Sequence, residues 1–232
     1  MRDSAGLWRD TLLPWLTCAA MLAAIAMVFL VVPSEREQGV VQRIFYFHVN
    51  LAWMAFAGFA FVAVASIWYL ATGNAHADRL ALANAEVGLL YTTLVMVTGP
   101  IWARPIWGTW WTWDPRLTMT VVLWTIYAAY IMLRRLGTGD DAILRYAAVL
   151  GIVGALDIPL LILAVRIWRG IHPAVMIAKD EDAGLKDPMM GWTLLVSGVA
   201  LALLFTWLVS LRARFARIDE GVARLAAEGA AA

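Results

Sequence analysis

Residues 49–71 read VNLAWMAFAGFAFVAVASIWYLA, and this stretch contains no Asp, Glu, Lys or Arg. An α-helix of about 20 apolar residues is long enough to cross the hydrocarbon core of a bilayer. Because the core offers no water, the backbone N–H and C=O groups of a spanning segment must bond to each other, which an α-helix achieves within the segment. The stretch therefore predicts a transmembrane helix.

Five further blocks of the same character predict an all-α integral membrane protein. The chain of 232 residues is 62% hydrophobic, well above the roughly 45–50% of soluble domains. We expect one membrane domain, 1–232, with six transmembrane helices at approximately 11–32, 49–71, 86–102, 118–133, 146–166 and 190–211. The sequence VVPSERE after the first block offers no signal-peptide cleavage site, so we interpret that block as a retained helix.

The distribution of Lys and Arg indicates the orientation. Six spans place both termini on one side, and ten of the 18 Lys and Arg then fall on that side and eight on the other. Two clusters, Arg134–Arg135 and Arg212–Arg217, favour cytoplasmic termini by the positive-inside rule. The expected outer segments are 33–48, 103–117 and 167–189, and the expected cytoplasmic tail is 212–232.

The outer segment 103–117, between the third and fourth helices, is rich in tryptophan. The cluster comprises Trp102, Trp107, Trp110, Trp111 and Trp113. Tryptophan anchors proteins at membrane interfaces, but a loop with many flat apolar rings also suits a large planar ligand. Burial of one ring stabilises by roughly 2–3 kcal/mol. The density of rings favours ligand binding over anchoring.

Two arginines flank the cluster. Arg104 precedes it and Arg116 follows it. A guanidinium pairs with a carboxylate through two parallel hydrogen bonds. We therefore expect these side chains to contact carboxylates at the rim of a planar ligand.

Two of the three histidines lie on the expected outer side. His48 precedes the second span and His172 follows the fifth, whereas His76 lies in an inner loop, where a solvated role is expected. Two imidazoles on one face can bind a haem iron from opposite sides, and each can equally be a polar cap of a helix. Zinc is a poor candidate, because it usually takes at least three protein ligands.

Asp157 is the one acid well inside a predicted span. A carboxylate in the bilayer is costly and is a functional candidate by default. Pro159 frees a backbone carbonyl nearby, which is a structural reason for a polar group there. The sequence leaves both interpretations open.

Several other functions find no support. Cys18 is the only cysteine, so disulfides within the chain and dithiol redox chemistry are excluded. No basic run predicts nucleic-acid binding, and no phosphate-binding loop or paired Ser and His predicts a hydrolase.

Three stretches resemble motifs of a known family. Residues 107–118, WGTWWTWDPRLT, resemble the WWD signature of haem-handling proteins of cytochrome c biogenesis. Residues 42–49, QRIFYFHV, and 165–172, VRIWRGIH, resemble the two external histidine motifs of the haem exporter protein C family, CcmC. Six spans also fit CcmC, whereas related haem lyases and synthases usually have more. Asn50 replaces a common proline and Ile167 a common tryptophan, but neither removes an imidazole.

The resemblance implies a haem-delivery protein, not an enzyme, whose functional face is the periplasmic face of the bacterial inner membrane. In this family two external histidines are the axial ligands of the iron of transiently bound haem b; the matching residues are His48 and His172. The matching residues of the haem platform and chaperone-docking surface are Trp107, Gly108, Trp110, Trp111, Trp113 and Asp114. Arg104 and Arg116 become candidate contacts of the haem propionates.

The resemblance also implies partners. These are a membrane-anchored haem chaperone (CcmE-like), the two subunits of an ATP-binding cassette transporter (CcmA-like and CcmB-like) and a small single-span subunit (CcmD-like).

Other functions stay open at this point. One is a haem lyase or synthase that attaches haem directly to apocytochrome. Another is a b-type electron-transfer cytochrome, which usually holds its histidines inside helices. A third is a transporter with an internal pathway, for which Asp157 is the only indication.

Overall fold

The computed structural model describes residues 8–137, 140–168 and 187–231, and their regular elements are helices. In chain order these are η1 (Trp8–Leu12), α2 (Leu13–Ala26), η2 (Met27–Val31), η3 (Val40–Arg43), α3 (Ile44–Thr72), α4 (Ala75–Trp107), α5 (Pro115–Leu136), α6 (Asp141–Ala155), α7 (Asp157–Ile167) and α8 (Pro188–Ala231).

Six helical stretches are long and apolar enough to cross a membrane, which confirms the predicted class. The η1, α2 and η2 turns form the first of them, η3 joins α3, and α6 joins α7. Large apolar side chains cover their outer surfaces; Leu30, for example, is 84% exposed. In water such a surface would be costly, whereas lipid tails cover it. The protein is therefore a multi-pass membrane protein.

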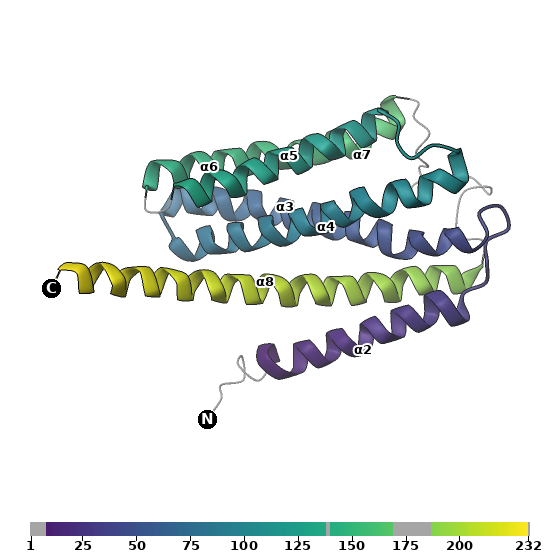
Figure 1. Ribbon diagram of the computed structural model, residues 1–232, viewed down its shortest axis with the longest axis horizontal. Coiled ribbons are helices and arrows are strands. Elements are labelled where there is room, and N and C mark those ends of the chain that lie inside the picture. The colour runs from purple at the N-terminus through teal and green to yellow at the C-terminus, as the bar shows by residue number, and fades with distance from the viewer. Residues whose placement is uncertain (1–7, 138–139, 169–186, 232) are drawn as a thin grey trace.

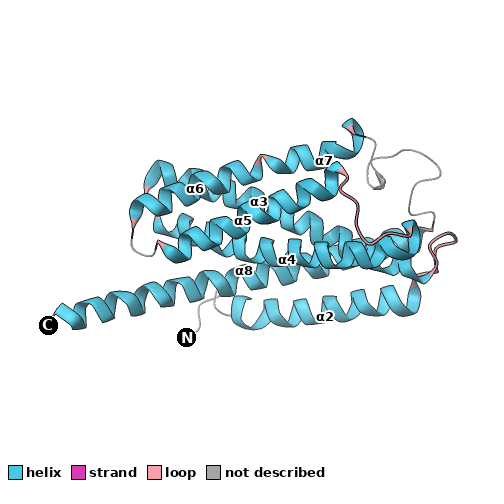
Figure 2. Cartoon of the chain, turned by 45° about the horizontal axis from the view of Figure 1, so that its top comes forward, coloured by secondary structure: helices cyan, strands magenta, loops and turns pink. Residues whose placement is uncertain are grey.

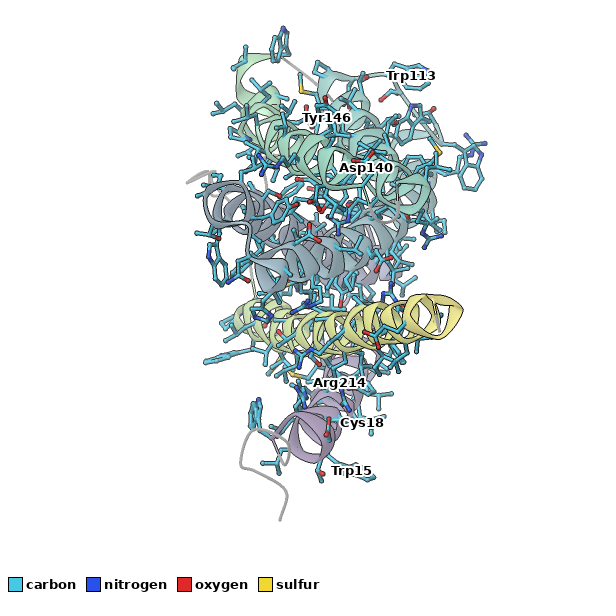
Figure 3. All side chains as sticks on the ribbon, turned by 90° about the vertical axis from the view of Figure 1, so that its left-hand side faces the viewer. Trp15, Cys18, Trp113, Asp140, Tyr146 and Arg214 are labelled. Carbon is cyan, nitrogen blue, oxygen red and sulfur yellow. The ribbon has the colours of Figure 1, made fainter. Side chains whose placement is uncertain are left out.

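The helices lie side by side in layers. Figure 1 shows α5, α6 and α7 in the top layer, α3 and α4 below them, then α8, and α2 at the bottom. Figure 3, which views the molecule from the end with the termini, shows the same order. We call that end the terminal end. The opposite end, which carries the connections 32–39 and 108–114, is called the loop end (Figure 2).

Helix α4 extends past both ends of the expected span 86–102. At its start the Asn74 side chain accepts the backbone N–H groups of His76 and Ala77, at 2.8 and 3.3 Å. At the other end α4 continues to Trp107, so the connection to α5 is 108–114, shorter than the expected 103–117. Hydropathy locates the apolar part of a helix, but caps determine where the helix begins and ends.

The expected span 146–166 consists of two helices. Pro159 has no N–H to bond to the carbonyl of Ala155, and its ring crowds that carbonyl. Helix α6 accordingly ends at Ala155, and α7 begins at Asp157.

The expected cytoplasmic tail 212–232 is helical almost to its end. Helix α8 continues through it to Ala231 and projects beyond the other helices (Figure 1). The segment contains no proline and is rich in Ala and Arg, which are good helix formers. The composition of this segment therefore allows α8 to continue past Leu211.

Aromatic side chains fill the interior. Phe59 on α3 stacks on Tyr127 on α5, with ring centroids 3.7 Å apart. The Tyr127 hydroxyl donates to the carbonyl of Gly151 on α6 at 2.9 Å, and the Tyr91 hydroxyl on α4 donates to the carbonyl of Leu201 on α8 at 3.0 Å. Burying a hydroxyl is costly unless it is hydrogen-bonded, so these bonds join the layers at defined positions.

Charged pairs connect the helices toward the terminal end. Arg134 on α5 binds both carboxylate oxygens of Asp78 on α4, at 2.5 and 2.6 Å, and the two side chains are only 8% and 11% exposed. Arg212 on α8 donates to Glu86 on α4 at 2.6 Å. Arg214, labelled in Figure 3, lies 2.5 Å from Asp10 near the N-terminus.

We predict that Arg134→Ala lowers the free energy of unfolding by about 3–5 kcal/mol, because it leaves the Asp78 carboxylate buried and unpaired. Denaturant unfolding in mixed micelles would measure this. Arg135→Ala is the matched control: this side chain is 75% exposed and 3.7 Å from Glu86, and such a pair contributes about 0–1 kcal/mol. Equal losses in the two variants would contradict the prediction.

Candidate functional site

His48 lies near the start of α3, toward the loop end, and is buried. The sequence places it just before a span beginning at residue 49, but α3 begins at Ile44, so His48 is a helical residue. Phe45 and Tyr46 are both buried and extend the packed part of α3 toward its N-terminus. The His48 side chain is only 7% exposed. The last residues of the expected outer segment 33–48 are therefore part of helix α3.

Residues of helix α4 contact the His48 imidazole. Its Nδ1 lies 2.8 Å from the Thr98 hydroxyl oxygen. The Trp102 ring meets the imidazole edge-on, with centroids 5.7 Å apart, and the Trp102 N–H donates to Gln38 at 3.0 Å. Between them, a Cβ on Gly99 would lie 3.3 Å from His48 Cε1, so the α4 backbone approaches the ring closely.

Thr98 and Gln38 were not among the residues that sequence reasoning selected, and Trp102 was selected only as part of the tryptophan cluster. A signal was nevertheless present, because Thr98, Gly99 and Pro100 follow one another without a large apolar side chain, although Thr92 and Thr93 lie in the same span. Their relation to His48 depends on how α3 and α4 are rotated against each other, which spacing along the chain does not reveal.

The tryptophan-rich connection begins with a left-handed glycine. Trp107 is the last residue of α4, and Gly108 follows with φ +73°. The Gly108 N–H donates to the carbonyl of Arg104 at 3.0 Å, and the Arg104 guanidinium donates to the carbonyl of Gly108. A side chain disfavours positive φ, so glycine allows the chain to leave α4 at this angle.

Three tryptophans of the connection differ in exposure. Trp110 is exposed, and Trp113, labelled in Figure 3, is 74% exposed. Trp111 is partly buried and packs edge-on against Trp113, with centroids 5.7 Å apart. Its N–H group is buried and has no hydrogen-bond partner among the described residues.

Asp114 caps α5. Its carboxylate accepts the backbone N–H of Leu117 at 2.9 Å, and Pro115 occupies the first helical position, where a missing N–H does no harm. Arg116 follows in the first turn and is partly buried, while Arg104 is exposed.

The other candidate residues lie elsewhere. His172 falls outside the described residues; α7 ends at Ile167 at the loop end, followed by exposed Trp168 (Figure 1). His76 lies at the start of α4, at the terminal end, with its ring 6.3 Å from that of Trp68. Asp157 lies about 15 Å along α7 from Ile167, at 1.5 Å per helical residue.

Asp157 is buried, and its Oδ2 has no partner among the described residues. It lies where Pro159 interrupts the fifth span, between α6 and α7. The structure does not bring it to the loop end with His48.

Asn50 explains one departure from the family pattern. Its side-chain amide donates to the carbonyls of Tyr46 and Leu194, at 2.8 and 3.0 Å, and so ties α3 to α8. Gly198 on α8 provides the space, since a Cβ there would lie 2.9 Å from the Asn50 oxygen.

The sequence is similar to those of known proteins. The sequence model of the CcmC family, described as Heme exporter protein C, matches residues 4–227. The Heme exporter protein C of Bradyrhizobium diazoefficiens is 32% identical over 84% of this chain and 75% of its own length. That of Rhodobacter capsulatus is 31% identical over 88% and 85%. A ccmC-like mitochondrial protein of cytochrome c biosynthesis from Arabidopsis thaliana is 33% identical over 71% and 61%.

We predict that Gly108→Ala lowers the free energy of unfolding by about 1–2 kcal/mol, the cost of the left-handed conformation for a residue with a Cβ. Thermal unfolding in detergent would measure the change. Gly191→Ala is the control, because Gly191 lies in α8 with no atom near its would-be Cβ and no positive φ. A Gly108→Ala variant as stable as the Gly191→Ala variant would contradict the left-handed conformation of Gly108.

Proposed function

Because this chain belongs to the haem exporter protein C (CcmC) family, we propose that it binds haem at the periplasmic face of the inner membrane and presents it to a haem chaperone. Family membership itself makes the chain a transmembrane component of haem transport in cytochrome c biogenesis. We propose in addition which residues bind the haem, at which membrane face they do so and which protein receives it.

One observation carries the proposal: the His48 imidazole is held against Trp102 toward the end of the molecule that carries the tryptophan-rich connection. An imidazole is a common axial ligand of haem iron, and aromatic rings cover a porphyrin well. His48 Nε2 has no hydrogen-bond partner among the described residues, so this nitrogen is available to a metal.

His48 and His172 are the two axial ligands in this proposal. His172 is four residues beyond Trp168, which follows the end of α7. It lies outside the described residues, so its part in the proposal rests on the resemblance of residues 165–172 to the second external histidine motif of the family. Haem is the cargo here: it is bound transiently as haem b and passed on.

The tryptophan-rich connection is the platform for haem and for the chaperone. The exposed rings of Trp110 and Trp113 offer apolar faces, and burial of each stabilises by roughly 2–3 kcal/mol. The unpaired Trp111 N–H is a donor that fits a carboxylate oxygen. Asp114 acts by capping α5, and Gly108 by directing the chain out of α4, so both set the shape of the platform.

The partners follow from the family. They are a membrane-anchored chaperone (CcmE-like) that receives the haem, an ATP-binding cassette pair (CcmA-like and CcmB-like) and a small single-span subunit (CcmD-like). Both termini face the cytoplasm, and the paired arginines Arg134, Arg212 and Arg214 toward the terminal end support this orientation. The chain acts as a delivery component and not as an enzyme.

A b-type electron-transfer cytochrome is the second candidate, and one observation favours it. His48 lies inside a helix and is buried, as the ligands of such cytochromes usually are. Against it, His76 lies at the opposite end of the molecule, so the described residues provide no second imidazole near His48. A measurement of haem release distinguishes the two candidate functions. A delivery protein gives its haem to an apo-chaperone, whereas an electron-transfer cytochrome keeps it.

We predict that the purified protein shows a Soret band of bis-imidazole character, and that His48→Ala and His172→Ala each weaken or shift it. Each substitution removes one iron ligand. Visible absorption spectra of the three proteins from haem-replete cells would test this. His76→Ala is the control and should leave the band unchanged. A colourless wild-type protein would overturn the proposed haem binding.

We predict that charge reversal at Arg104 or Arg116 weakens haem binding, because guanidinium groups there meet the propionates. Haem titration followed at the Soret band would give the change in Kd, with about tenfold expected for the loss of a contact of roughly 1.4 kcal/mol. Arg36→Glu is the control: it makes the same change of charge in the connection 32–39, whereas Arg104 and Arg116 flank the tryptophan-rich connection. Charge-reversed variants that bind haem and load the chaperone normally would rule out the propionate contacts.

A further inference from the structure

Thr98 links the His48 imidazole to the backbone of α4. His48 Nδ1 is 2.8 Å from Thr98 Oγ1, and Thr98 Oγ1 is 2.8 Å from the carbonyl oxygen of Leu94. A hydroxyl has one hydrogen to donate, and a carbonyl oxygen can only accept. When the Thr98 hydroxyl donates to Leu94, the hydrogen between Nδ1 and Oγ1 comes from the imidazole.

The opposite arrangement makes one hydrogen bond fewer. If the Thr98 hydroxyl donated to Nδ1, it could no longer donate to the Leu94 carbonyl, 2.8 Å away. The arrangement with hydrogen on Nδ1 keeps both contacts as hydrogen bonds, so it is preferred.

Neighbouring residues of α4 restrict the orientation of the ring without competing for its nitrogens. Trp102 meets the imidazole edge-on, and its own N–H is already bonded to Gln38. The α4 backbone at Gly99 lies against Cε1, the carbon between the two nitrogens. In this orientation Nδ1 is bonded to Thr98 of α4, and Nε2 is on the side of the ring away from that bond.

We propose that Thr98 is a positioning residue: it selects the His48 tautomer with hydrogen on Nδ1 and so makes Nε2 the nitrogen that binds iron. Metal-binding histidines generally donate their other N–H to a nearby acceptor, and losing that acceptor weakens metal binding. The iron-binding part of this inference rests on the proposed function. The tautomer is a property of the chain alone.

The first experiment measures the tautomer in haem-free protein. Full-length chain labelled with ¹⁵N-histidine and placed in lipid nanodiscs gives signals from only three histidines, and His48→Ala identifies the one of interest. The expected wild-type signal is that of a neutral ring protonated on Nδ1. Thr98→Ser should keep it, whereas Thr98→Val, of similar shape but without the hydroxyl, should shift the signal toward protonation on Nε2.

The second experiment measures haem affinity by titration at the Soret band. We expect about 10–100-fold weaker binding for Thr98→Val and near-wild-type binding for Thr98→Ser. Thr92→Val is the matched control, because Thr92 also donates to a carbonyl one turn earlier on α4, that of Gly88 at 2.9 Å. Its removal should leave haem binding unchanged.

The outcomes separate the inference from the proposed function. A wild-type ring protonated on Nε2 overturns the inference, even if Thr98→Val does not fold. Wild-type affinity in Thr98→Val overturns it as well. A wild-type protein that shows the Nδ1 tautomer but binds no haem overturns the proposed function and leaves Thr98 as the residue that selects the tautomer.

Discussion

The absence of water from the bilayer core constrains every polar group in this protein. Backbone groups are satisfied by helices, and many threonine hydroxyls in the spans are satisfied by the turn that precedes them. Threonine side chains donate to carbonyls four residues earlier at, among others, Thr17, Thr92, Thr125, Thr193 and Thr206. Two threonines of α4 also contact a side chain of another helix. Thr93 accepts the Trp124 N–H of α5 at 2.9 Å, and Thr98 joins α4 to the His48 imidazole.

The same constraint gives the two ends of the molecule different chemistry. Toward the terminal end the buried charges of Arg134 and Asp78 form a pair that connects α5 to α4, and Arg212 with Glu86 connects α8 to α4. At the loop end exposed tryptophans project from the connection 108–114, and an imidazole lies buried near them. An end fixed by ion pairs and an end rich in apolar rings suit a protein that holds a planar apolar cargo at one membrane face.

Sequence alone predicted the six-helix class because charge-free blocks are a direct consequence of the hydrocarbon environment. The ends of the helices were harder to predict from the sequence. They are determined by the cap at Asn74, the left-handed Gly108 and the break before Pro159. The candidate residues His48 and the tryptophans could be selected because such residues are rare and concentrated. Thr98 could not be selected as the partner of His48, because that contact depends on the rotation of α3 against α4. His172 falls outside the described residues, so its role remains a prediction of the sequence.

The central claim is that the loop end holds haem iron between His48 and His172. A cryo-EM map of the haem-loaded protein tests it most directly. The account predicts porphyrin density beside the tryptophan-rich connection, with the iron bonded to His48 Nε2 at about 2.0–2.1 Å, a typical distance for imidazole bound to a metal, and to His172 on the opposite side. Porphyrin density elsewhere in the protein, or iron bonded to other residues, would contradict it.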